Sequence, residues 1–299
     1  MFVDGLGIGA NHHHNPFAVG DYPGLGSLMA DSAPLDLGIG EMRSSVGSTL
    51  KAVDTTFGVP GLPQSATGQT ALLTGEPAPL IVGRHVHAFP TRELRSMLER
   101  CNVFSRTKGR GLAVTFLNAY RELDKTGRPK GRRNSCTTVA VLAAGIAFRD
   151  LCDLRKGRAV YHDVTGESLV NRGYQVCVRT PEASAMCAKQ VVEENALTVF
   201  EYFMTDYAGH SQDERLASDA LSTLDRFVMQ LTLVLDPTRT FIVLSSDHGN
   251  IEDMSTPRHT RNPVPLAVWG GTCEERQRVL AEARDISYVA KTLDRLVIL

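Results

Sequence analysis

Hydrophobic positions along the chain switch repeatedly between short β-type runs and helical spacing. The β-type runs cover residues 1–3, 112–117, 159–161, 198–203 and 241–245. Between them, apolar residues return every three or four positions, which indicates amphipathic helices. Strands that alternate with helices predict an α/β fold with a central, mostly parallel sheet that is covered by helices on both faces.

Helix-start and helix-stop signals locate five helices between these strands. Gly75 is the expected end of the helix over 67–74, and Thr91 is the expected side-chain N-cap of the helix over 91–103. In the longest helix the apolar residues keep helical spacing, so that face is expected to pack on the sheet. The expected helices cover residues 67–74, 91–103, 137–150, 181–194 and 213–235.

Two segments are expected to be irregular. About forty glycine-rich residues follow Asp4, which is too long for a plain connection and is typical of a loop that lines a site. Residues 121–134 are densely basic and contain glycine and proline, so we expect an exposed excursion or lid there. The prediction is one domain over 1–299 with a three-layer α/β/α core and a small cap or lid insertion at about 121–180.

The first strand is unusually short for a central strand. Only residues 1–3 precede Asp4, whereas strands typically have about five or six residues. Two explanations stay open: either the natural start lies upstream of Met1, or this strand is frayed.

Composition excludes several classes of protein. The 299 residues include 32 Lys and Arg and 33 Asp and Glu, and a net charge of −1 gives no general affinity for nucleic acid or membranes. The six cysteines form no C-x-x-C pair, which disfavours a zinc ribbon or a disulfide framework. No apolar run suits a signal peptide or a bilayer span, so we expect a cytoplasmic protein.

Aspartate and histidine occur together just after two of the expected strands. Asp247 and His248 follow the run 241–245, and Asp206 and His210 follow the run 198–203. Asp4 follows the first strand, and the carboxyl ends of neighbouring parallel strands share one edge of a sheet. Carboxylates and imidazoles that gather at one edge are the ligands of a two-metal site.

A serine stands at the start of the first expected helix. Ser65 would be close to unpaired N–H groups and to the positive end of the helix dipole, both of which favour a phosphate. A serine hydroxyl is a weak nucleophile unless a base or metal activates it. Ser65 alone, however, is more often a helix cap than a nucleophile.

Taken together, these motifs resemble the alkaline phosphatase superfamily, and most closely its metalloenzyme branch. That branch contains the cofactor-independent phosphoglycerate mutases and the phosphopentomutases. The resemblance covers residues 2–9, 54–75 and 180–268, and its most specific part is the tail from Asp206 to His259. It implies that Asp206, His210 and His259 hold one metal and that Asp4, Asp247 and His248 hold a second. Ser65 would be the nucleophile bound between the two metals.

The resemblance implies an enzyme that transfers phosphoryl groups on a small phosphate ester through a phosphoserine. The cofactors would be two divalent ions, Mn²⁺ or Zn²⁺, and Thr67 is the competing hydroxyl because threonine serves in some members. The alternative is a non-catalytic metal-binding or regulatory relative. A sulfatase is disfavoured because the C/S-x-P-x-R motif is absent.

Two departures from the mutase pattern bear on the reaction. Gln69 stands where the mutases have a histidine, so substrate contacts should differ. Only residues 66–205 separate Ser65 from Asp206, and several of them are core elements, so any cap is small. A reduced cap favours phosphatase activity, while a mutase with a lid near 121–180 stays open.

Other polar residues carry weaker signals. His12, His13 and His14 are either a solvated loop or a contact for substrate or metal. Asn118 either reaches the phosphate or is a turn residue, and the stretch 84–87 either binds an anion or is loop surface.

Overall fold

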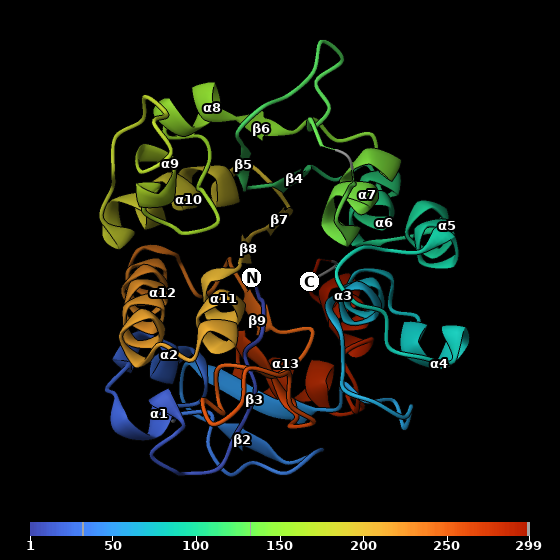
Figure 1. The fold of residues 1–299 in the computed structure, drawn as a ribbon, viewed down its shortest axis with the longest axis vertical. Coiled ribbons are helices and arrows are strands. Elements are labelled where there is room, and N and C mark those ends of the chain that lie inside the picture. Colours follow the sequence, from blue (N-terminus) through green and yellow to red (C-terminus); the bar gives the residue numbers. More distant parts are fainter. Residues whose placement is uncertain (32, 132, 298–299) are drawn as a thin grey trace.

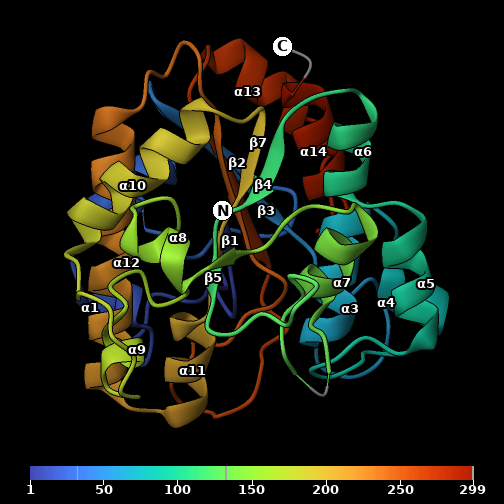
Figure 2. The ribbon, with the colours of Figure 1, turned by 90° about the horizontal axis from the view of Figure 1, so that it is seen from above.

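The computed structural model of the chain describes residues 1–31, 33–131 and 133–297. Figure 1 and Figure 2 show three layers: a sheet with helices on each of its two faces. The predicted α/β/α fold class is therefore confirmed. Among the described residues, no helix combines the length and apolar character needed to cross a bilayer.

In the described part of the chain, the central sheet has six strands in the order β2-β3-β10-β9-β1-β8. β1 lies between β8 and β9 and is parallel to both, with Phe2 opposite Glu201 and Ser245. β3, β10 and β9 pair in an antiparallel manner, so the sheet is mixed. Its strands are β1 (Phe2–Val3), β2 (Met42–Ser44), β3 (Ser48–Val53), β8 (Glu201–Tyr202), β9 (Ile242–Ser245) and β10 (Val264–Trp269).

Two further pairs of parallel strands form small sheets apart from the six-stranded sheet. β4 pairs with β7, and β5 pairs with β6. Their bounds are β4 (Val114–Phe116), β5 (Ala119–Tyr120), β6 (Arg149–Asp150) and β7 (Leu197–Val199).

Each face of the sheet has its own apolar core and its own set of helices. One core is formed with α1 (Pro16–Val19), α2 (Pro23–Leu28), α10 (Pro181–Glu193), α11 (Met204–Ser211) and α12 (Glu214–Val234). The opposite core is formed with α3 (Ser65–Thr74), α4 (Ala78–Val82), α5 (Arg92–Arg100), α6 (Val103–Gly109), α7 (Cys136–Ala143), α13 (Cys273–Leu280) and α14 (Tyr288–Leu296).

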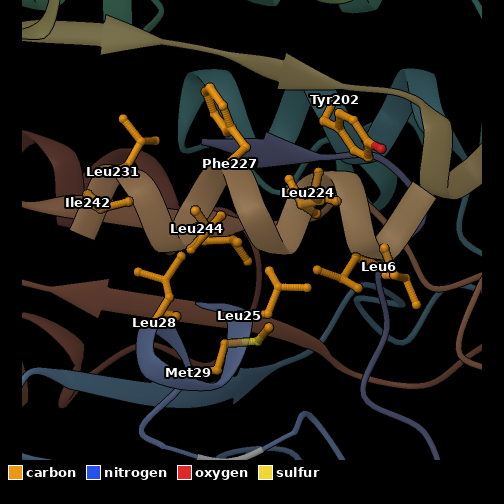
Figure 3. Close-up of a cluster of buried hydrophobic side chains, with 14 of the residues drawn as sticks. Leu6, Leu25, Leu28, Met29, Tyr202, Leu224, Phe227, Leu231, Ile242 and Leu244 are labelled. Carbon is orange, nitrogen blue, oxygen red and sulfur yellow. The ribbon is translucent and has the colours of Figure 1, made fainter. Parts of the chain in front are cut away.

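The helix α12 shows why periodicity predicts packing here. Leu224, Phe227 and Leu231 recur on one face and are buried against the sheet and α2 (Figure 3). Asp213 caps the helix by accepting hydrogen bonds from the N–H groups of Arg215 and Leu216. Fully burying one such leucine or phenylalanine contributes about 1.5–3 kcal/mol, so this face fixes the helix on the sheet.

Several expected elements differ from the structure. The expected loop after Asp4 contains α1, α2 and β2, and the fully buried strand β3 (Ser48–Val53) follows it. Residues 159–161 form only an isolated bridge, between Asn118 and Val160, and the helix expected over 137–150 ends at Ala143. The errors that concern strands share a cause: short segments acquire strand structure from partners that are distant in sequence.

The expected insertion is only partly separate from the core. α7 packs in the core beside α3, whereas the short helices α8 (Leu151–Arg155) and α9 (Glu167–Val170) lie at the top of Figure 1. Leu154, Tyr161 and Leu169 belong to a small apolar cluster of their own. A cap at about 121–180 remains a prediction, and residues 149–176 are its best-defined part.

Arg276 on α13 is a buried cation that joins three segments. Its guanidinium, fully shielded from solvent, donates to the carbonyls of Ser45, Val46, Gly270 and Gly271 and to the hydroxyl of Thr49. The cation thus satisfies the acceptors at the ends of β3 and β10, which supports the edge of the sheet.

Replacing Arg276 by alanine is expected to lower the free energy of unfolding by about 3 kcal/mol or more. The substitution leaves buried carbonyls unpaired and opens a cavity. Urea unfolding measures the loss, and Arg278→Ala, which removes an exposed arginine from the same helix, should change it by less than about 0.5 kcal/mol. Equal effects of the two variants would contradict this role.

Candidate active site and metal centre

The seven side chains predicted for the site come from five separate parts of the chain. Asp4 follows β1, Asp247 and His248 follow β9, and Asp206 and His210 lie on α11 just after β8. Since β8, β1 and β9 are parallel neighbours, their carboxyl ends meet at one edge. The loop with His259 and the first residue of α3, Ser65, complete the group.

Asp4, Asp247 and His248 form one buried cluster. The Nε2 atom of His248 lies 3.4 Å from Oδ1 of Asp4 and 3.4 Å from Oδ2 of Asp247. One ligand atom from each residue lies within 4.8 Å of the other two. Oδ1 of Asp4 is buried and accepts no hydrogen bond from the described residues, so this oxygen is available to a cation.

Asp206, His210 and His259 form the adjacent cluster. Nε2 of His210 lies 3.4 Å from Oδ2 of Asp206, and Nε2 of His259 lies 3.6 Å from Oδ1 of Asp206. His248 also comes within 4.8 Å of Asp206 and His259, and its ring stacks on that of His259 at 3.6 Å. The two clusters are therefore contiguous.

The two histidines of this second cluster are oriented as metal ligands usually are. Nδ1 of His259 lies 2.8 Å from the carbonyl of Pro63, and Nδ1 of His210 lies 2.7 Å from the carbonyl of Pro257. A proton on each Nδ1 leaves both Nε2 atoms with free lone pairs, 3.1 Å apart. Two lone pairs repel each other at this distance when nothing lies between them. Two nitrogens that each bind the same tetrahedral ion at about 2.05 Å lie about 3.3 Å apart, which is close to the separation of these two atoms. The donor set fits a divalent cation.

Burial favours the neutral form of four of these side chains, so a cation must displace protons from the two carboxyls, whereas the two imidazoles are already in their ligand form. Burial, followed by the charges of Asp247 and Asp206, raises the pKa of Asp4 well above its usual value. Burial and the charge of Asp206 raise the pKa of Asp247 to about 7. Burial also lowers the pKa of His248 and His259 to about 4, which keeps both imidazoles neutral and able to coordinate.

Ser65 is the hydroxyl that faces these clusters. Its Oγ lies 3.2 Å from Nε2 of His248, at the first position of α3. Thr67, the competing hydroxyl, is fully buried; it donates to the carbonyl of Gln64 and accepts from the N–H of Val86. Of the two hydroxyls, Ser65 is therefore the one that lies beside the clusters.

Glycines permit the close approach of the segments that carry the site. A Cβ atom on Gly68 would lie 2.5 Å from the carbonyl oxygen of Asp247, so α3 can approach the end of β9 only without a side chain. Gly5 has a φ of +69°, and a Cβ there would lie 2.8–2.9 Å from atoms of Asp206.

Three polar side chains that support the ligands were not assigned a role from the sequence. Asn250 donates to Oδ1 of Asp206 at 2.8 Å, and Gln69 donates to Oδ2 of Asp247 at 3.3 Å. Gln69 is buried and orients a carboxylate. The third side chain is Glu252. Asn250 and Glu252 lie within or just after the Asp-His motif, but only the tertiary contacts reveal their partners.

Glu252 connects the loops that carry the ligands. Its buried carboxylate accepts from the N–H of Gly7 at 3.0 Å, the N–H of Asn250 at 2.7 Å and the side chain of Asn262 at 3.1 Å, and it also bonds the hydroxyl of Thr260. These partners lie one to three residues from His248 and His259, or just beyond Asp4. Glu252 thus holds three ligand-bearing loops together.

We expect Glu252→Ala to lower metal affinity about 10- to 100-fold, because the loops lose their common anchor. Several buried donors also lose their acceptor, so the free energy of unfolding should fall by about 2–3 kcal/mol. Equilibrium dialysis with Zn²⁺ and urea unfolding measure both effects. Arg258→Ala, an exposed change in the same loop, is the control; equal metal affinity in both variants would refute the anchoring role.

Glu201 adds another buried carboxyl beside the first cluster. It lies on β8 opposite Phe2, and burial, with a further contribution from Asp247, raises its pKa to about 8. The folded protein therefore holds a proton that the unfolded chain releases above about pH 4.5. The stability that this protonated carboxyl contributes should be fully present below about pH 4.5 and should be lost as the pH rises toward 8.

Glu201→Gln is expected to reduce this pH dependence. In metal-free protein the slope of unfolding free energy between pH 5 and 8 should become shallower by about 1.4 kcal/mol per pH unit, because one titrating group is lost. Urea unfolding in chelator at several pH values measures the slope. The exposed Glu99→Gln serves as control, and an unchanged slope in Glu201→Gln would contradict the shift.

The remaining candidates lie elsewhere or have structural partners. Asn118 exchanges hydrogen bonds with the backbone of Glu201, at 2.7 and 2.9 Å, so it joins strands. His85 contacts the carbonyl of Val59 at 3.3 Å. His87 bonds the side chain of Gln64, next to Ser65, at 2.9 Å and is exposed.

The fold and the clustered carboxylates and imidazoles together define an α/β protein of the alkaline-phosphatase-like class. A sequence model of the metalloenzyme superfamily matches residues 1–295. The chain belongs to the metalloenzyme superfamily.

Relatives in sequence are 2,3-bisphosphoglycerate-independent phosphoglycerate mutases. The one from Ehrlichia canis is 26% identical over 127 residues, which are 38% of this chain and 25% of that enzyme. The one from Halobacterium salinarum is 36% identical over 73 residues, 23% of this chain and 14% of that enzyme. The similarity thus spans a quarter or less of these mutases.

Solved structures share the fold over nearly the whole chain. A protein from Pyrococcus horikoshii has a TM-score of 0.59 at 15% identity, and 99% of this chain and 95% of that chain are covered. The alkaline phosphatase from the Antarctic bacterium TAB5 has a TM-score of 0.54 at 10% identity, with 99% and 97% covered. At this identity the likeness concerns the fold alone.

Proposed function

We propose that this chain transfers phosphoryl groups on a small phosphate ester, as a phosphatase or phosphomutase, through phosphorylated Ser65. The observation that carries the proposal is the position of Ser65: its Oγ lies 3.2 Å from His248, beside both ligand clusters and at the start of α3. Membership of the metalloenzyme superfamily and similarity to phosphoglycerate mutases support it.

Two divalent cations, Mn²⁺ or Zn²⁺, fit the donor set. Asp206, His210 and His259 would hold one, and Asp4, Asp247 and His248 would hold the other together with Ser65. Mixed imidazole and carboxylate ligands suit both metals. When bound, such ions withdraw charge from the phosphate and lower the pKa of a coordinated hydroxyl.

The residues of the chain then bind the phosphate and exchange its bonds. In the first turn of α3 the N–H of Ala66 donates to the carbonyl of Val86 and that of Gly68 to the carbonyl of Gln64, and Gln64 forms no side-chain cap among the described contacts, so the N–H groups of Ser65 and Thr67 are the donors that a phosphate oxygen would use. Ser65 Oγ releases its proton to solvent as it attacks phosphorus, and the bond to the ester oxygen breaks as that oxygen takes up a proton from solvent. Water or a second hydroxyl then attacks the phosphoserine and releases Ser65.

The size of the insertion favours hydrolysis over a mutase reaction. A mutase must retain its intermediate until the second transfer, which requires a cover over the site. Among the described residues of 121–180, α7 belongs to the core, so a cap would consist of the exposed segment before α7 and the small cluster around Leu154 and Tyr161. We therefore favour a phosphatase.

Product analysis tests the proposal and separates the two reactions. Protein loaded with Mn²⁺ or Zn²⁺ is incubated with phosphoglycerates and sugar phosphates and followed by ³¹P NMR. Free phosphate indicates hydrolysis, and a phosphate that moves within the substrate without release indicates a mutase. If neither occurs with any metal or substrate of the panel, the non-catalytic metal-binding alternative is favoured.

A further inference from the structure

We propose that a turn formed by His12, His13 and His14 is a metal site separate from the paired clusters, and that it takes a divalent transition metal such as Ni²⁺ or Zn²⁺. One ring nitrogen from each histidine lies within 4.8 Å of the other two. The ring centroids are 4.0, 4.0 and 5.1 Å apart. Imidazole is a preferred ligand of these ions.

The backbone explains why three consecutive side chains gather on one side. In an extended chain, successive side chains would point to opposite faces. Here the N–H of Asn15 donates to the carbonyl of His12 at 2.8 Å, which closes a turn and brings the three rings together.

The turn is anchored to the protein on both sides. Asn15 is buried, caps α1 through the N–H of Phe17 and donates to the carbonyl of Ala10 at 3.1 Å. The carbonyl of His14 accepts from the N–H of the buried Met254 at 2.9 Å. A fixed backbone lowers the entropy lost when the rings converge on an ion, which distinguishes this cluster from histidines on a flexible loop.

The rings need only a small adjustment to coordinate an ion. Ligand nitrogens about 2.0–2.1 Å from a metal lie about 3–3.5 Å apart, so the rings must move inward by about 1 Å. His12 and His13 are exposed. The contact from the N–H of His14 to Nδ1 of His12 is 3.4 Å long, and a metal ion would replace it.

The surroundings of His13 favour its neutral ring. Partial desolvation and the neighbouring His12 and His14 lower the pKa of His13, whereas Glu214 at the start of α12 opposes this shift. A neutral imidazole is the form that binds metal, and Glu214 adds negative charge near the site.

Untagged protein on an immobilised Ni²⁺ column tests the site. Wild type should be retained, and His12→Ala/His13→Ala/His14→Ala should elute in the flow-through. His87→Ala, which removes another exposed histidine, should be retained like wild type. Retention of the triple variant equal to wild type would overturn the proposal.

Zn²⁺ stoichiometry by equilibrium dialysis provides a second measurement. The triple variant should bind one equivalent less than wild type, whatever number the paired clusters hold. If the triple variant does not fold, as seen by circular dichroism, the single change His13→Gln should still weaken this equivalent at least tenfold. An unchanged isotherm refutes the site. Neither readout depends on turnover, so failure of the phosphoryl-transfer proposal would leave this test intact.

Discussion

Ser65→Ala is expected to reduce phosphate-ester turnover by about a thousandfold or more, because no other hydroxyl in the described site takes its position beside His248. Metal affinity should change much less, since the three aspartates and three histidines remain. Steady-state turnover and Zn²⁺ dialysis measure the two effects. Acid-quenched wild type incubated with labelled substrate should carry phosphate on Ser65, and the variant should carry none.

Thr67→Val is the matched control for this prediction. Thr67 is buried and bonded to Gln64 and Val86, so its loss should lower the unfolding free energy by about 1–3 kcal/mol and change turnover only a few-fold. If Thr67→Val abolished turnover while Ser65→Ala retained it, the nucleophile would be Thr67. Equal turnover in Ser65→Ala and wild type would reject the phosphoserine mechanism.

Metal removal is the second change with a large expected effect. Chelation should reduce turnover to background, and Mn²⁺ or Zn²⁺ should restore it. Asp247→Asn should lower metal affinity more than about a hundredfold, because a neutral amide replaces a buried carboxylate that lies 3.4 Å from His248. Turnover as a function of metal concentration, together with elemental analysis, measures both.

The exposed Asp219→Asn on α12 is the control for the ligand variant and should keep wild-type affinity. Full activity in protein shown to be free of metal would contradict a metal-dependent reaction. Wild-type affinity in Asp247→Asn would remove Asp247 from the ligand set and leave the cluster around Asp206 as the metal site for turnover.

The sequence indicated which side chains converge at the site in more detail than it indicated the elements around them. Asp206, His210, Asp247 and His248 follow strands directly, and parallel strands end at a common edge, so their convergence follows from local pattern. Glu252 and Gln69 could not be found in this way. Each is buried by contacts with distant loops, and a carboxylate or an amide alone gives no sign of its partner.

Fold prediction failed mainly where an element depends on strand pairing. β3 (Ser48–Val53) follows the glycine-rich region and was not expected as a strand, yet it is a buried strand because β10 and β2 pair with it on either side. The helix α12 was predicted closely, from 213–235 against Glu214–Val234, because helical periodicity is contained within the segment.

The sequence by itself determined the α/β class, the long amphipathic helices and the identity of the residues that converge at the ends of the strands, because periodicity and strand-end motifs are local. Only the tertiary structure decided which hydroxyl faces the histidines, which side chains orient the ligands, and that three successive histidines share one side of a turn. These features depend on distances between segments that packing alone brings together, and they change with shifts of one or two ångströms that no local pattern encodes.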